Sequence, residues 1–202
     1  MSKQIISSTR SGKLINLLDI HPNQILLSDI CYGLSREVRF CGQTIRPYTV
    51  CEHTILGCKV LEGLKASTAT ILVWLCHDMS ESYIKDIPSP LKKYLGNIYT
   101  DLEDYITNSI YNKFNIPVKD ADLDLVKSVD RAMIYFESRA LQPNIPLRYM
   151  PDIVNHPNFI APNIPSHITS EQELYNGLEN LMKEYIKIHE SSCDQKRELS
   201  II

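Results

Sequence analysis

Four ionisable side chains interrupt the apolar helical patterns of this sequence: His53, His77, the adjacent Asp78, and Asp130. Each falls on the inner face of an expected helix or at the end of a buried one, where an ionised carboxylate is costly unless a cation or hydrogen bonds compensate it. Two imidazoles and two carboxylates suit a divalent ion such as Mn, Fe, Co or Zn, and they leave positions for water and a phosphate oxygen. The pattern therefore predicts a metal centre for phosphate chemistry. The alternative is that each is a hydrogen-bonded core or helix-cap residue.

The segments that carry these residues are expected to be helices. Residues 47–64 repeat apolar side chains at three- and four-residue steps, with Pro47 in the first turn, which places His53 on the inner face. Residues 67–79, capped by Ser67, are apolar on all sides, as in a helix buried within a bundle. A third apolar stripe, from about 120 to 140, includes the position of Asp130.

Further capping signals complete the prediction of an all-α bundle. Thr100 with Glu103, and Ser170 with Glu173, each form a capping box ahead of an apolar helical pattern. Ser28 is the predicted cap of another helix near the N-terminus.

Prolines are concentrated between the last two expected helices. Six of the eleven prolines of the chain fall within residues 141–169, which forbids a long helix there. A long irregular loop of this kind is expected to act as a lid, a pocket wall or a subunit contact. We expect residues 1–190 to form one domain that includes this loop, and residues 191–202 to form a flexible C-terminal tail.

Composition and charge restrict the class of partner. A net charge of −3 without a run of Lys or Arg argues against a nucleic-acid polymer, because duplex binding requires many neutralised phosphates. No segment has the pattern of an export signal or the length needed to cross a membrane. None of the six cysteines belongs to a Cys-x-x-Cys pair, so we expect reduced thiols in a cytoplasmic protein.

Three stretches resemble the HD-domain metal-dependent phosphohydrolases. Residues 77–94, HDMSESYIKDIPSPLKKY, are similar to the HD-x-(S/A)-E-x-x-x-x-D-(I/L)-P-x-P segment of the deoxynucleotidase branch. Residues 125–138, LVKSVDRAMIYFES, resemble the helix that supplies the last metal ligand. Residues 34–54, LSREVRFCGQTIRPYTVCEHT, resemble the Arg-rich approach to the first His. The resemblance covers roughly residues 14–140 and implies a compact HD-domain bundle.

Site roles follow from the resemblance, position by position. The resemblance implies that His53, His77, Asp78 and Asp130 bind the metal ion. It also implies that Glu81 is a catalytic carboxylate, that Asp86 is a second acid of the site, and that Arg39 binds phosphate. Other readings remain open: Glu81 as an exposed helix residue, Asp86 as a helix cap, and Arg39 as a surface charge. The full set of predicted substrate-binding residues is Arg39, Arg46, Lys85 and Gln43. Many relatives have a His where this chain has Gln43, so the role of that His does not transfer to Gln43.

The implied reaction is hydrolysis of a deoxynucleotide phosphate. We expect a triphosphohydrolase that converts dATP to deoxynucleoside and triphosphate, as in small phage members of the family. A 5′-deoxynucleotidase that removes phosphate from monophosphates is the alternative, and a catalytically silent nucleotide-binding HD domain is a third reading. The expected cofactor is one divalent ion (Zn, Co or Mn), with Fe or Mg possible as an additional phosphate-bound ion. A homo-oligomer that binds no membrane is also expected.

Overall fold

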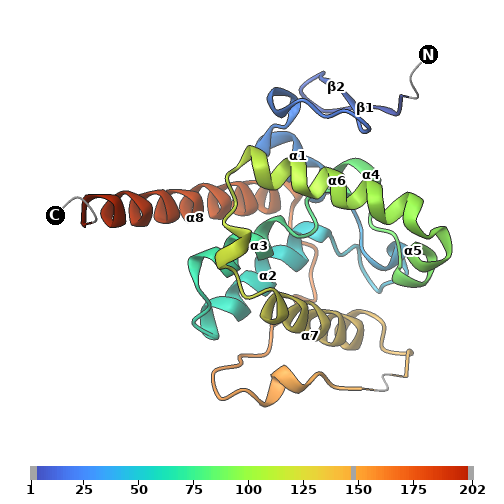
Figure 1. Ribbon diagram of the computed structural model, residues 1–202. Helices are drawn as coiled ribbons and strands as arrows, with labels where there is room; N and C mark the ends of the chain where they lie inside the picture. Colours follow the sequence, from blue (N-terminus) through green and yellow to red (C-terminus); the bar gives the residue numbers. More distant parts are fainter. Residues whose placement is uncertain (1–3, 147–148, 200–202) are drawn as a thin grey trace.

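Helix α3 (Thr68–Cys76) lies at the centre of the fold, and residues 69–76 are buried on every side of it. The structure is a computed structural model that describes residues 4–146 and 149–199. A helix that is apolar all round needs neighbours all round. These neighbours are α2 (Val50–Gly63), α6 (Asn97–Lys113), α7 (Leu123–Leu141) and α8 (Glu171–Leu199) (Figure 1). The prediction of an all-α fold is confirmed, with one small hairpin added.

Shorter elements complete the architecture. The hairpin pairs β1 (Ile6–Ser8) with β2 (Leu14–Asn16) in antiparallel register, and it lies at the top of Figure 1. Helix α1 (Leu27–Leu34) packs against α8 and against the short α4 (Glu81–Ile84). The remaining elements are η1 (Pro22–Gln24), η2 (Phe40–Gly42), α5 (Ser89–Leu95), η3 (Val118–Asp120) and η4 (Asp152–Asn155). None of the described helices is both long enough and apolar enough to span a lipid bilayer.

Two of the predicted helix caps are confirmed. The Ser67 hydroxyl accepts a hydrogen bond from the Thr70 backbone N–H at 3.2 Å and begins α3. At the start of α8, the Ser170 hydroxyl accepts from Glu173 N, and the Glu173 carboxylate accepts from Ser170 N, which completes a capping box. Both helices begin where the apolar pattern and the cap agree.

Three predicted helix starts are wrong. Helix α2 begins at Val50 rather than at Pro47, because Thr49 forms a capping box that sequence inspection missed. Helix α1 contains Ser28 instead of being capped by it. Helix α6 begins at Asn97, after a Gly96 with φ of +64°, so Thr100 lies inside the helix. A capping residue is a weak signal when the chain reversal before the helix is set by packing and by a glycine that tolerates positive φ.

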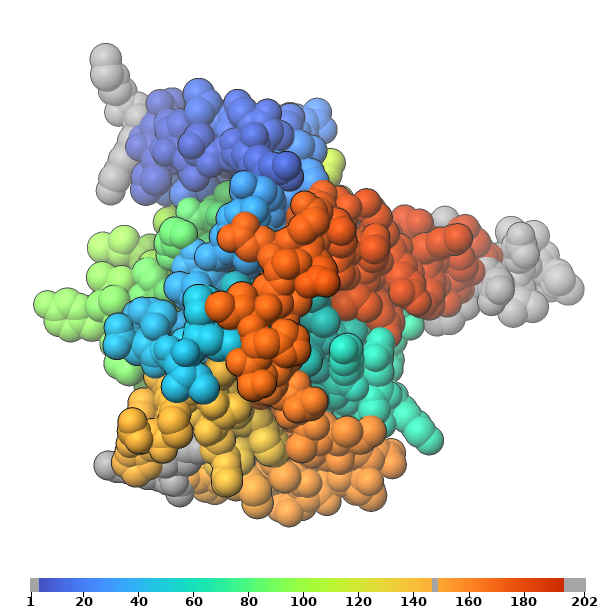
Figure 2. All heavy atoms as spheres, turned by 180° about the vertical axis from the view of Figure 1, so that it is seen from behind, coloured from blue at the N-terminus to red at the C-terminus, as the bar shows by residue number. Residues whose placement is uncertain are grey.

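The proline-rich segment crosses one face of the molecule. It continues from the end of α7 and reaches α8 as the orange stretch in Figure 2. Phe159 stacks on Phe136 of α7 at 5.9 Å between ring centroids, and the Pro165 carbonyl accepts a hydrogen bond from Arg46. The segment is therefore packed against the helical body. Helix α8 runs on through residues 191–199, which the sequence analysis assigned to a tail, while residues 200–202 lie outside the described residues.

A close crossing joins α2 to α3. The indole of Trp74 is fully buried and donates a hydrogen bond to the Thr54 carbonyl at 2.8 Å. Its ring lies so close to Gly57 that a Cβ atom at that position would be 1.9 Å from ring carbon Cζ2. The absence of a side chain at Gly57 therefore sets how closely the two helices approach.

We predict that Gly57→Ala destabilises the fold by about 2 kcal/mol, because the added methyl group overlaps a fully buried ring. Urea denaturation followed by far-UV circular dichroism measures the change in the free energy of unfolding. Gly177→Ala in α8 is the matched control, since its new Cβ meets only the flexible end of Ile55. Equal stability of Gly57→Ala and wild type would contradict this account of the crossing.

Candidate metal centre

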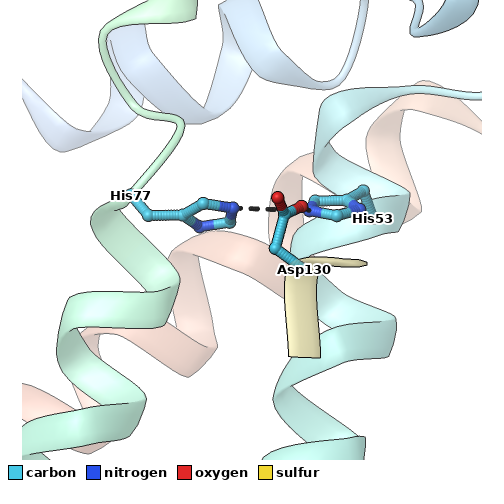
Figure 3. Close-up of side chains that lie close together, drawn as sticks. All are labelled: His53, His77 and Asp130. Carbon is cyan, nitrogen blue, oxygen red and sulfur yellow. Dashed lines mark hydrogen bonds and ion pairs between the residues drawn. The ribbon is translucent and has the colours of Figure 1, made fainter. Parts of the chain in front are cut away.

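His53, His77 and Asp130 converge from three helices. His53 lies in α2, His77 caps the C-terminus of α3, and Asp130 lies in α7. Their potential ligand atoms all lie within 4.8 Å of one another, and the three side chains point toward a common centre in Figure 3. The two Nε2 atoms are 3.4 Å apart, and His53 Nε2 is 3.4 Å from Asp130 Oδ1. This group can hold a metal ion, as the sequence predicted for these three residues.

Hydrogen bonds on the outer side of each ring determine which nitrogen faces the centre. His77 Nδ1 lies 2.5 Å from the Trp74 carbonyl, which can only accept, so this nitrogen carries the proton. His53 Nδ1 lies 2.7 Å from the Glu137 carboxylate and donates to it. Each Nε2 therefore presents a lone pair inward, which is the arrangement found in histidines that bind metals.

The donor set fits a divalent ion. Asp78 Oδ2 adds a further acceptor, 3.2 Å from His77 Nε2 and 3.7 Å from His53 Nε2. Ligands that share one ion at bond lengths of about 2.1 Å are separated by about 3.0–3.4 Å. The observed spacing is close to this range, and acceptors alone would repel one another without a cation between them.

The pKa values of the adjacent residues His77 and Asp78 show that this part of the structure favours positive charge. Burial lowers the pKa of His77, but the carboxylates of Asp78 and Asp130 raise it by more, so it lies above its ordinary value. Burial raises the pKa of Asp78, but His77, His53 and Arg39 together lower it by more, to well below its usual range. The surroundings of these two side chains therefore favour positive charge beside the Asp78 carboxylate.

Glu137 is a buried residue of the site that sequence inspection missed. Its carboxylate is fully buried, accepts hydrogen bonds from His53 and from the Tyr48 hydroxyl at 2.9 Å, and lies 3.3 Å from Arg39 Nε. Burial raises the pKa of Glu137, but Arg39 and then His53 lower it by more, so its carboxyl stays ionised. Its spacing of seven residues from Asp130, two helical turns, was the available signal.

A hollow adjoins the metal centre. Asp78 and Asp130 line it on one side, and α5 with the loop before it lines the other. Its charged lining also includes Arg39, Glu81, Asp86 and Lys92. The structure thus brings the predicted metal-binding carboxylates, both predicted acids and one predicted phosphate-binding residue to a single cavity.

Glu81 is the acid most removed from water. Its side chain is 4% exposed, and Oε2 accepts no hydrogen bond among the described residues. Burial, followed by the charges of Asp78 and Asp86, raises the pKa of Glu81 to about 10. Glu81 is therefore protonated at neutral pH and can donate a proton. Asp86 is half-buried, and burial also raises its pKa.

Three predicted substrate-binding residues do not line this hollow. Arg46 is buried against Glu52 at 2.9 Å, where it ties the start of α2 to the proline-rich segment. Lys85 is exposed and pairs with Glu37. Gln43 lies in a separate hollow beside the end of α7, and its carbonyl accepts a hydrogen bond from Gln142. Their charge or hydrogen-bonding capacity made them candidates for phosphate contacts, whereas the fold places their side chains away from this hollow.

The fold and site define a mostly helical protein with a candidate His/His/Asp metal centre. No protein-family model matches the chain. The chain is 30% identical over 185 residues to uncharacterized protein YfdR of Escherichia coli (strain K12), which covers 87% of this chain and 96% of that protein. It is 32% identical over 111 residues to uncharacterized protein RCAP_rcc00048 of Rhodobacter capsulatus, which covers 53% of this chain and 57% of that protein. The chain belongs to the family of YfdR.

We predict that Glu137→Gln weakens binding of Mn²⁺ by about 10- to 100-fold, because the carboxylate orients the His53 ring and increases its basicity. Isothermal titration calorimetry with the purified, metal-stripped protein measures the affinity. Glu190→Gln on the exposed face of α8 is the control and binds Mn²⁺ as wild type does. Unchanged affinity in Glu137→Gln would show that the outer hydrogen bond does not support the centre.

Proposed function

We propose that the protein is a metal-dependent phosphohydrolase that acts on deoxynucleotide phosphates. One observation carries the proposal: the carboxylates of Asp78 and Asp130 line both the metal centre and a hollow that contains a buried acid and a guanidinium. Phosphate-ester hydrolysis needs these parts together, since charge on the phosphate must be held while the leaving oxygen gains a proton. The resemblance of three sequence stretches to HD-domain phosphohydrolases supports the same reaction class.

The proposed ligands of the ion are His53, His77, Asp78 and Asp130. A bound divalent ion supplies Lewis-acid polarisation of a phosphoryl oxygen. Arg39 lines the hollow and lies 3.2 Å from Asp78 Oδ2, so it stands beside the place where phosphate would bind. Its planar guanidinium can hold two phosphate oxygens at once.

Glu81 is the proposed general acid. In the hydrolysis, a bond forms between a water oxygen and phosphorus while the bond from phosphorus to the 5′-oxygen breaks, and the leaving oxygen takes up a proton. Glu81 lines the hollow, is shielded from water, and has an Oε2 atom without a hydrogen-bond partner among the described residues. Lys92 lies 3.6 Å from Glu81 Oε1 and is held by Glu103 at 2.6 Å, which restrains the acid from its outer side.

The charges of the hollow favour a monophosphate as substrate. Of the described residues that line it, Arg39 and Lys92 are the cations, and both already face carboxylates. A triphosphate carries more negative charge and would need further cations, but Arg46 and Lys85 point elsewhere. A 5′-deoxynucleotidase is therefore the favoured activity. The dATP triphosphohydrolase, which the resemblance to small phage members of the HD-domain family implies, is the second candidate.

We predict that the wild-type protein with Mn²⁺ or Co²⁺ releases phosphate from deoxynucleoside monophosphates, and that His77→Ala abolishes this activity. Chromatographic separation of the products from dAMP, dATP and the other nucleotides measures it. His167→Ala, in the exposed proline-rich segment, is the control and retains full activity. Formation of triphosphate plus deoxynucleoside would replace the nucleotidase with the triphosphohydrolase. Nucleotide binding without turnover would indicate a silent domain and overturn the enzyme proposal.

We predict that Glu81→Gln lowers kcat by about 100-fold, the usual contribution of a positioned general acid. Metal affinity should be unchanged, because Glu81 is not among the proposed ligands. Steady-state kinetics with the best substrate from the panel, together with Mn²⁺ titration, measures both quantities. A variant that keeps the wild-type kcat would remove Glu81 from the chemistry.

A further inference from the structure

A strained residue directly precedes Asp86. Lys85 has φ of +77° and ψ of +153°, a backbone conformation that belongs almost entirely to glycine. Lys85 is the C-cap of α4, and residues 85–88 connect α4 to α5 in an irregular segment. A side chain in this conformation costs free energy, so the surrounding structure must hold the Lys85 backbone in place.

Glu37 supports the backbone at Lys85 and Asp86 from one side. Its Oε2 atom pairs with Lys85 Nζ at 2.5 Å, and its Oε1 atom accepts a hydrogen bond from the Asp86 backbone N–H at 3.3 Å. The Glu37 carboxylate therefore binds both the strained residue, Lys85, and the residue after it, Asp86. From the other side, the Tyr99 hydroxyl of α6 donates a hydrogen bond to the Lys85 carbonyl at 3.1 Å.

Glu37 itself is firmly placed. It is 8% exposed, and its backbone carbonyl accepts a hydrogen bond from Val50 N at the start of α2. Since α2 carries His53, the same framework that positions the candidate metal centre also positions the carboxylate that holds Lys85. Glu37 does not contribute to the described lining of the hollow, whereas Asp86 does.

We propose that Glu37 is a positioning residue that holds Lys85 in its strained conformation and thereby aims the Asp86 carboxylate into the hollow beside Glu81. This inference rests on the proposed function, in which the hollow is the site of phosphate hydrolysis. Glu37 acts through Asp86 and makes no contact with substrate. The strained backbone of Lys85 is the reason why these contacts are needed. Without the Glu37 carboxylate, the Lys85 backbone relaxes and the Asp86 carboxylate moves out of the hollow.

The test compares Glu37→Gln, Lys85→Gly and the double variant, with Mn²⁺ and the deoxynucleotide that wild type hydrolyses best. Glu37→Gln keeps the shape of the side chain and loses the ion pair. We expect its kcat to fall about tenfold, with KM and Mn²⁺ affinity within about twofold of wild type, because an acid is misplaced and binding is not. In the double variant, glycine removes the strain, so kcat recovers most of the loss and the unfolding midpoint rises by about 2–4 °C relative to Glu37→Gln.

The matched control is Glu171→Gln, which breaks another carboxylate–cation pair of 2.5 Å, with Arg36, away from the hollow. Its kcat should equal that of wild type. An active wild type with an unchanged kcat in Glu37→Gln, or a double variant no better than Glu37→Gln, overturns the positioning role and leaves the proposed function standing. A wild type that hydrolyses no nucleotide overturns both, and the two failures are thereby distinguished.

Discussion

The buried carboxylate of Glu137 is the constraint on which the site depends. A fully buried anion is stable only when cations or donors surround it, and Glu137 has Arg39, the Tyr48 hydroxyl and the His53 ring as partners. Two of these partners also contact the rest of the site. The His53 ring presents its other nitrogen to the candidate metal centre, and the Arg39 guanidinium reaches Asp78 and the hollow. One buried charge therefore fixes the orientation of groups on both sides of the site.

Close helix packing carries this arrangement across to α3. The Trp74 indole fits over Gly57 and stacks on the His77 ring at 4.3 Å between centroids, while the Trp74 carbonyl holds His77 Nδ1. The position of His77 thus follows from the packing of a large aromatic residue in the core. The candidate metal centre therefore adjoins the packed core, and this packing orients the His77 ring without the help of a ligand.

The far wall of the hollow is held in a different way. The loop from Lys85 to Pro88 and the start of α5 have few buried apolar side chains, so ion pairs and hydrogen bonds take the place of packing. Glu37 and Tyr99 hold the backbone at Lys85 and Asp86, and Glu103 fixes Lys92 near Glu81. The candidate metal centre therefore depends on core packing, and the opposite wall of the hollow depends on charge pairing beside the strained backbone of Lys85.

The sequence by itself determined the helical class, the buried character of α3, and the grouping of His53, His77 and Asp130, because helical periodicity places residues on a face without reference to the rest of the fold. Its capping signals succeeded at Ser67 and Ser170 and failed at Thr100, where the chain reversal at Gly96 decided the start of the helix. Only the tertiary structure decided which charges meet. It turned Arg46 and Lys85 away from the hollow and brought Glu137 and Glu37 to their partners, since pairing between distant segments depends on how the helices pack in three dimensions.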